Sequence, residues 1–199
     1  MGDPRKSKKK YETPNHPWER ARIEEEKGIV KTFGFRRKKE IWKMQSQLRK
    51  IKQQAKDLIR RTDENAKKQQ EVLMNRLVKM GLFEKPVELE KILDLPSEAI
   101  FKRRLQTIVY EKGFAHSPKQ ARQFITHGHI TINSKVVNVP SYIVKKEEEE
   151  KISFKESSPL QSPDHPERKS KEDKKEITKA PEQPQNPAEV VAPQRNEQL

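Results

Sequence analysis

The sequence contains no cysteine, which excludes disulfide bonds and any zinc site built on thiolates. Apolar residues are scarce as well, because they make up only 31% of the 199 residues. That share is too low for one large core, and it favours one or two small domains with disordered or partner-ordered segments. Long apolar runs are missing, and none follows the charged N-terminus. We therefore expect neither a transmembrane helix nor a secretory signal.

Positive charge is in excess, and it is unevenly distributed. The formal net charge is +14, and 37% of the residues are charged. Residues 1–61 carry 20 Lys/Arg against 8 Asp/Glu, whereas residues 147–199 carry 9 against 13. A strongly basic segment repels itself when isolated but gains affinity for phosphates by releasing their counterions. The expected partner is therefore a polyanion.

Residues 101–144 have the pattern of two short basic helices followed by a β-hairpin. The first helix is expected to begin with Ser97 as its N-cap. Its inward-facing residues are Ile100, Leu105, Ile108 and Val109. The second helix begins at Ser117, with Pro118 at the first helical position and Gln120 completing a capping-box pattern.

The hairpin follows Gly128, which ends the second helix. The alternation in His129-Ile130-Thr131-Ile132 predicts a half-buried strand. Asn133-Ser134 predicts a turn, because Asn tolerates positive φ, and Lys135–Val139 predicts the returning strand. Lys151-Ile152-Ser153-Phe154 could add an edge strand. Basic side chains recur throughout and nothing resembles a catalytic site, so the pattern favours a compact module that grips folded RNA.

Residues 36–61 give the clearest helix of the chain. Its apolar residues step by three and four and share one face: Ile41, Met44, Leu48, Ile51, Ala55 and Leu58. The other faces are basic. Such a helix could lie on an anionic membrane, or pack on protein with one side and pair with phosphates on the other. The neighbouring module favours the second interpretation.

Further helices are expected over 18–33, interrupted at Gly28, over 63–80 and over 87–93, which gives a helical lobe. The packing side of the 63–80 helix is expected to carry Val72, Leu73, Leu77 and Met80. Glu24–Glu26 form an acidic island, either a solvated face or internal partners of nearby arginines. Trp18 and Trp42 suit a core between helices better than a base-stacking platform.

The module resembles the S-four RNA-binding domain. The motifs that carry this resemblance are Arg103-Arg104-Leu105, Gly113-Phe114-Ala115, Ser117 with Gln120-Ala121-Arg122-Gln123, Ile125, His127-Gly128-His129, Asn133 and Pro140-Ser141-Tyr142. That domain also occurs in pseudouridine synthases, heat-shock proteins and tyrosyl-tRNA synthetases. By itself it would therefore identify a module and not a whole protein.

The rest of residues 1–160 resembles the archaeal-type ribosomal protein S-four family. The matching motifs are Gly2-Asp3-Pro4, Tyr11-Glu12-Thr13-Pro14, His16-Pro17-Trp18, Lys39-Glu40-Ile41-Trp42 and Arg104-Leu105-Gln106-Thr107-Ile108-Val109-Tyr110. The resemblance implies a non-enzymatic constituent of the small ribosomal subunit in the cytoplasm. It implies binding to the 5′ domain of small-subunit rRNA early in assembly, a place near where mRNA enters, and an influence on decoding accuracy.

Two features depart from this family. Many relatives bind zinc through cysteines near the N-terminus, and this chain has none, so we expect no metal and no cofactor. The hairpin turn of relatives is often Asn-Gly, whereas this chain has Asn133-Ser134. Serine is tolerated there at modest cost, so the expected fold is unchanged.

The expected fold class is α+β: a basic, mainly helical N-terminal lobe plus a small S-four-type domain of two helices and a β-hairpin, then a disordered C-terminal tail. The expected parts are a basic arm (1–17), ordered only along RNA, a helical rRNA-binding lobe (18–97), the RNA-binding domain (98–158) and the tail (159–199). The tail has too few apolar residues to offset its ordering entropy.

Thirteen residues are expected to contact RNA, and Arg104 and Arg122 among them are expected to be exposed. They are Arg36, Arg37, Lys38, Lys39, Arg49, Lys50, Arg103, Arg104, Lys119, Arg122, His127, His129 and Lys135. The other expected partners are neighbouring ribosomal proteins and mRNA, with no membrane and no small-molecule substrate.

One rival is an RNA-modifying enzyme, which would need an additional catalytic domain. The other is a membrane-surface protein, which would leave the helix–helix–hairpin pattern unexplained.

Overall fold

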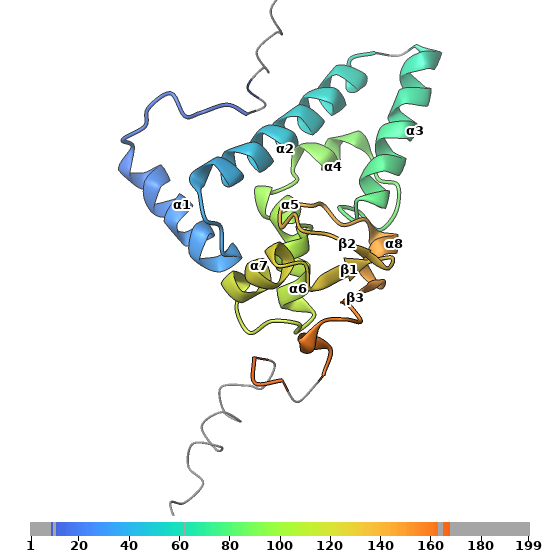
Figure 1. The fold of residues 1–199 in the computed structure, drawn as a ribbon. Helices are drawn as coiled ribbons and strands as arrows, with labels where there is room; N and C mark the ends of the chain where they lie inside the picture. Colours follow the sequence, from blue (N-terminus) through green and yellow to red (C-terminus); the bar gives the residue numbers. More distant parts are fainter. Residues whose placement is uncertain (1–8, 10, 62, 163–164, 168–199) are drawn as a thin grey trace, which may run out of the picture.

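The computed structural model describes residues 9, 11–61, 63–162 and 165–167. Its fold class is α+β, as predicted, with a helical N-terminal half and a small three-stranded sheet in the C-terminal half. Figure 1 shows α2 (Lys38–Ile59) running along one side of the molecule and α3 (Glu64–Lys79) turning back beside its far end. The sheet lies on the side of α4 and α5 that faces away from α2 (Figure 1).

The helical half contains α1 (Arg20–Phe33), α2, α3, α4 (Leu89–Leu93) and α5 (Ser97–Lys102). The predicted apolar face of α2 is confirmed, because all six of its residues are buried. The predicted interruption at Gly28 is wrong, since α1 continues through it. One glycine destabilises a helix interior by about 1 kcal/mol, too little to break it. Instead α1 ends at Gly34, whose φ of 65° favours a residue without Cβ.

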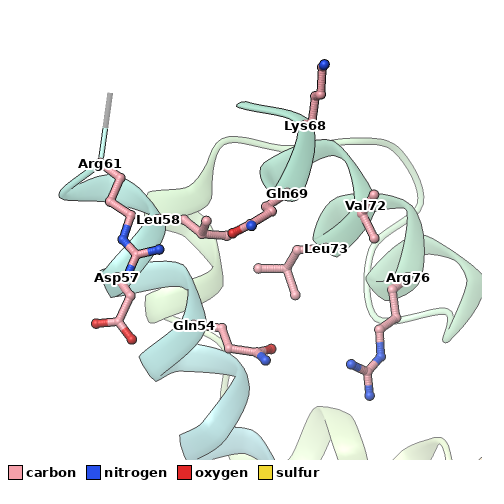
Figure 2. Close-up of a pocket in the computed structure, with 9 residues that line it drawn as sticks. All are labelled: Gln54, Asp57, Leu58, Arg61, Lys68, Gln69, Val72, Leu73 and Arg76. Carbon is pink, nitrogen blue, oxygen red and sulfur yellow. The ribbon is translucent and has the colours of Figure 1, made fainter. Parts of the chain in front are cut away.

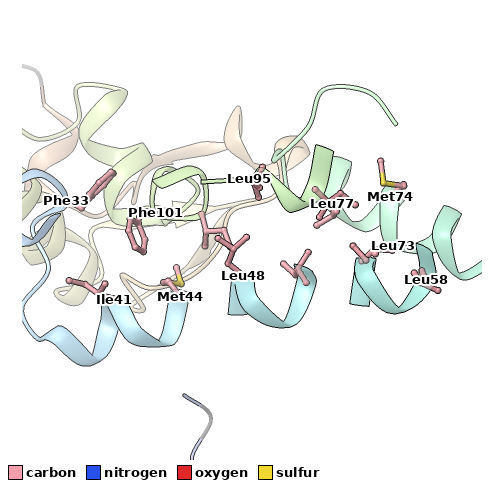
Figure 3. Close-up of a cluster of buried hydrophobic side chains, with 14 of the residues drawn as sticks. Phe33, Ile41, Met44, Leu48, Leu58, Leu73, Met74, Leu77, Leu95 and Phe101 are labelled. Atoms are coloured by element: carbon pink, nitrogen blue, oxygen red, sulfur yellow. The ribbon is translucent and has the colours of Figure 1, made fainter. Parts of the chain in front are cut away.

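The core of this half fills the space between α2 and the helices facing it. Figure 3 shows Ile41, Met44 and Leu48 of α2 pointing toward Phe101 and Leu95, with Leu58 facing Leu73 further along. At the end nearest α1, the rings of Phe33 and Phe35 meet Phe101 edge-on, at centroid distances of 5.4 and 5.3 Å. Aromatic edge contacts of this kind fix the α1–α2 loop against α5.

Val72 does not pack as predicted, because its side chain is 68% exposed while Leu73 is 7% exposed. Figure 2 shows Leu73 pointing between α3 and α2, with Val72 on the outer side of α3.

Leu73→Ala should therefore destabilise the fold by about 2–5 kcal/mol, whereas Val72→Ala should change stability by about 0.5 kcal/mol or less. Urea unfolding of the two variants measures the difference, and equal midpoints would contradict this packing.

The C-terminal half contains α6 (Leu105–Glu111), α7 (Pro118–Thr126), β1 (Ile130–Ile132), β2 (Lys135–Val136), α8 (Lys146–Glu149), β3 (Ile152–Phe154) and a 3-10 turn (Pro159–Gln161). A second apolar cluster lies between α6, α7 and β1. The sheet is antiparallel in the order β2-β1-β3, so the predicted additional strand is confirmed.

The central strand β1 is fully buried, so the prediction of a half-buried strand is wrong. The physical reason is β3, which pairs with β1 on the side opposite β2. Thr131 is buried there with its hydroxyl 3.0 Å from the Ser153 hydroxyl. The turn is as predicted, with φ of 51° at Asn133 and 63° at Ser134. The returning strand is shorter than predicted and covers only Lys135–Val136.

The predicted helix from Ser97 to Val109 is instead two helices, broken at Arg103–Arg104. The backbone there pairs with the segment before α8. Leu105 donates to the Tyr142 carbonyl at 2.8 Å, and Val144 donates to the Arg103 carbonyl at 3.0 Å. These bonds need an extended chain, which a continuous helix could not supply. Ser117, by contrast, caps α7 as predicted, accepting from the Gln120 N–H at 3.2 Å.

The predicted tail is ordered at its first residues. Leu160 is 5% exposed and belongs to the second apolar cluster, so residues 159–161 pack on the domain. The prediction of disorder beyond that point falls mostly on 163–164 and 168–199, which lie outside the described residues. Most of the predicted arm lies outside them too. Its described part contacts α2, because the Glu12 N–H donates to the Ser46 hydroxyl at 3.0 Å.

Candidate nucleic-acid interface

Eight of the thirteen predicted RNA contacts are exposed. They are Arg36, Arg37, Lys39, Arg49, Lys50, Lys119, His127 and Lys135. Arg36 and Arg37 lie in the loop before α2, and Lys119 lies in the first turn of α7. Arg49 pairs with Glu12. Among described residues, the other exposed lysines and arginines of this set form no ion pair, so their charge is available to a ligand.

Lys38 is committed to an internal network. Its ammonium lies 2.9 Å from the Glu26 carboxylate, which also receives Arg22 at 2.7 Å and the Trp42 indole N–H at 2.9 Å. Burial alone would raise the pKa of Glu26, but hydrogen bonds from Trp42, Lys38 and Arg22 outweigh it and lower the pKa. Of the two interpretations of the acidic island, the internal partner therefore holds for Glu26. Glu24 instead forms an exposed pair with Arg20.

Arg104 is not the exposed residue that the sequence predicts, because its side chain is 1% exposed. Its guanidinium lies 4.4 Å from the centre of the Phe35 ring and donates to Glu40 at 2.8 Å. Arg122, which is half-buried, donates to both oxygens of the same carboxylate at 3.1 Å. One carboxylate on α2 thus receives two arginines of the domain. Replacing both arginines with Glu would put three carboxylates together and break this contact between the lobe and the domain.

The environment of Glu40 favours its charged form. Burial would raise the pKa of this carboxyl, but the hydrogen bonds from Arg122 and Arg104 outweigh it, and the pKa lies below its ordinary value. Burial lowers the pKa of Arg104, and Glu40 opposes that shift. The three groups therefore form a charged bridge between lobe and domain.

Arg103 is half-buried and also acts within the protein. It donates to Glu149 at 2.7 Å and to the Val144 carbonyl at 3.0 Å. A Cβ added at Gly81 would meet the guanidinium carbon at 2.7 Å, so glycine lets α3 end against this side chain. Arg103 thereby ties α8 to the end of α3, and little of its charge faces solvent.

The two histidines differ. His127 is exposed, and its ring centre lies 6.3 Å from that of His129. His129 Nδ1 lies 2.9 Å from the Ser158 hydroxyl. Burial, and then the neighbouring His127, His165 and Lys155, lower the pKa of His129, which favours the neutral ring at neutral pH. The described residues contain no group of three or more metal-ligating side chains.

Two residues of the lobe–domain contact were missed from the sequence. Glu40 looked like one acid in a basic helix, and no local pattern marks it. Gln106 is 1% exposed, and its amide nitrogen donates to the carbonyls of Gly34 and Pro118 at 2.9 and 2.8 Å. A glutamine inside an apolar run was the available signal. A Cβ at Gly34 would lie 2.6 Å from Pro118 Cβ, so the close approach itself requires glycine.

The expectation that both tryptophans are core residues is wrong for Trp18, which is 88% exposed. Trp42 is half-buried and stacks on Tyr11 at a centroid distance of 6.4 Å. The reason is the described part of the arm. It turns back over α2, so Tyr11 takes the place beside Trp42.

A groove of ≈ 480 Å³ lies between the end of α2 and α3 (Figure 2). Its apolar lining residues are the buried Leu58 and Leu73 and the exposed Val72. Its charged rim is mostly basic, with Arg61, Lys68 and Arg76 against Asp57. The groove widens the basic surface beyond the residues predicted from sequence.

Residues 103–150 match the S4 domain. The chain is 47% identical over 169 residues to small ribosomal subunit protein uS4 of Methanococcus aeolicus, covering 84% of this chain and 96% of that protein. It belongs to the uS4 family.

Further relatives carry the same name. The uS4 protein of Methanococcus maripaludis is 48% identical over 169 residues, covering 84% of this chain and 95% of that protein. That of Methanothermobacter thermautotrophicus is 43% identical over 160 residues, covering 80% and 94%. The resemblance to the archaeal type is thereby confirmed, and so is the expectation that the chain is not an enzyme. No described helix is long and apolar enough to cross a membrane.

Proposed function

We propose that this chain is a structural constituent of the small ribosomal subunit that binds small-subunit rRNA directly. The observation that carries the proposal is the match to uS4 proteins over 84% of the chain and nearly their whole length. The geometry supports it, because exposed cations without carboxylate partners lie on both the lobe and the domain. Lysines and arginines neutralise phosphates, and two bodies joined at a fixed angle recognise the shape of an RNA junction.

The finer proposal concerns place and consequence. The chain binds a junction of the 5′ domain of small-subunit rRNA and nucleates assembly there. It contacts neighbouring ribosomal proteins and lies close to mRNA where the message enters the ribosome, and so contributes to decoding accuracy. Its location is the small subunit of cytoplasmic ribosomes, and it has no small-molecule substrate. The charged bridge at Glu40 supports this proposal because it holds the lobe and the domain in one orientation.

Crosslinking to RNA in a cell lysate, followed by sequencing of the bound RNA, tests this function. Crosslinks should concentrate in the 5′ domain of small-subunit rRNA. Arg36→Gln/Arg37→Gln should reduce them without unfolding the protein, since both side chains are exposed. The matched control is Arg20→Gln, which removes an exposed arginine already paired with Glu24. Crosslinks spread over tRNA or large-subunit rRNA would contradict the proposal.

A further inference from the structure

A concave site of ≈ 390 Å³ lies at the seam between the lobe and the domain. Its walls come from one face of α2, from α7, from the residue before α6 and from the loop at Pro140-Ser141. The loop is fixed, because the segment after it pairs with the backbone around Arg104. The volume exceeds by far the ≈ 30 Å³ share of one water molecule. The walls therefore enclose room for a ligand larger than a single water.

The charges lining this site do not balance. The described lining residues include three cations, Lys43, Arg104 and Arg122, and a single carboxylate, Glu40. Glu40 receives both arginines, and Lys43 is exposed without an ion pair among the described residues. The seam thus holds positive charge that its one carboxylate does not compensate.

Arg104 makes the imbalance costly. It is 1% exposed, yet its Nε and Nη1 atoms have no hydrogen-bond partner among the described residues. A buried cationic donor without an acceptor is unfavourable, and the effect of an incompletely paired charge grows in a low-dielectric interior. The site therefore favours an additional anion near its mouth, even if that anion attracts Arg104 only by long-range electrostatics and forms no hydrogen bond with it.

The mouth of the site offers donors of the kind that bind an oxyanion. Arg122 contributes a partly exposed guanidinium, Lys43 an ammonium and Ser141 an exposed hydroxyl. Guanidinium and ammonium groups form the stronger, charge-assisted hydrogen bonds with phosphate. None of the side chains supplies a nucleophile with an adjacent base, so the site is suited to binding and not to reaction.

We propose that this seam is a binding site for one phosphate group, supplied by the RNA backbone. This inference rests on the proposed function, which provides the RNA, but it assigns a separate site and adds Lys43 and Ser141 to the contacts. A phosphate there touches α2 of the lobe and α7 of the domain at once. It therefore binds well only while the two bodies keep the orientation set by Glu40, and so couples RNA binding to that orientation.

The first arm of the test uses inorganic phosphate and the full chain. Thermal unfolding is followed while phosphate replaces chloride at constant ionic strength. At about ten times the dissociation constant, phosphate should raise the wild-type Tm by about 3 °C. Lys43→Gln and Ser141→Ala should lose most of that rise, and neither breaks an ion pair among the described residues. The matched control is Lys56→Gln, an exposed lysine of α2 outside the seam. Equal rises in all variants would overturn the site.

The second arm identifies the source of the phosphate. Fragments of the 5′ domain are prepared with single backbone phosphates replaced by neutral methylphosphonates, and their affinities for wild type and Lys43→Gln are compared. One position should weaken wild-type binding about tenfold and have little effect on Lys43→Gln. If the unmodified RNA binds but no position shows this pattern, the inference fails and the proposed function stands. The RNA source would be overturned if inorganic phosphate or an acidic peptide of a neighbouring protein distinguished wild type from Lys43→Gln while no methylphosphonate position did so. Failure of the unmodified RNA to bind would instead overturn the proposed function.

Discussion

Glu40→Gln should destabilise the folded protein by about 3 kcal/mol. The substitution removes the carboxylate that receives both Arg104 and Arg122 and leaves a 1%-exposed guanidinium without its charged partner. Removing one member of a buried ion pair typically costs about 3–5 kcal/mol, and the low end applies because Glu40 is 18% exposed. Urea unfolding of the full chain at neutral pH measures the change.

The control for this variant is Glu24→Gln. Its partner Arg20 lies at 2.9 Å, nearly the same distance as Arg104 from Glu40, but the two side chains are 92% and 60% exposed. Exposed pairs typically contribute less than about 1 kcal/mol. If the two variants lost equal stability, burial of the Glu40 bridge would not be what holds the lobe on the domain.

Acid provides a second measurement on the same bridge. Because the pKa of Glu40 lies below the ordinary 4.5, the folded state holds its proton less tightly than the unfolded chain. The stability from this carboxylate is complete above that ordinary value and is lost as the pH falls through the lowered pKa. Unfolding of Glu40→Gln should therefore depend less on pH in this acid range. Some dependence should persist, since the pKa of Glu26 is lowered as well.

Affinity for the rRNA 5′ domain should fall by about 10³ to 10⁵ between 50 and 200 mM salt, if about six to ten phosphates are neutralised. The physical reason is counterion release. Each exposed, unpaired cation of the interface contributes to that release. Filter binding or fluorescence anisotropy over a salt series gives the slope. A salt-insensitive affinity would contradict electrostatic attachment.

Variants can assign this slope to residues. Arg36→Gln/Arg37→Gln should reduce it by about 1 for each phosphate that the variant no longer neutralises. Arg20→Gln, which removes an arginine already paired with Glu24, should leave it nearly unchanged. A reduction by Arg20→Gln half as large as that by the double variant, which removes twice the charge, would mean that only total charge matters, not the position of the cations.

Local patterns in the sequence predicted several features of the fold. The apolar stripe of α2, the Ser117 cap and the Asn133-Ser134 turn were all predicted, because each depends on residues within one or two helical turns of each other. Charge was predicted as a total but not residue by residue. Arg36 and Arg104 look alike in the sequence, yet one is exposed and the other has 1% of its side chain exposed.

The errors have a common cause. The helix expected from Ser97 breaks because Leu105 hydrogen-bonds with Tyr142, and the strand expected to be half-buried is central because Phe154 and its neighbours pair with it. Trp18 is left outside because Tyr11 takes the place beside Trp42. Each partner lies far along the chain, where periodicity carries no information.

The sequence by itself determined the fold class, the basic character, the lack of thiolate chemistry and, through its motifs, the family. The first three follow from composition and from spacings of three, four or two residues, which are local properties of helices and strands. The family follows from the resemblance of whole motifs to those of known proteins. Only the tertiary structure decided which cations are available to RNA. That depends on whether the cation is paired with a carboxylate inside the folded protein. Arg104, for example, is paired with Glu40, which lies 64 residues away in the sequence. Folding sets these distances, and the same distances create the under-compensated seam.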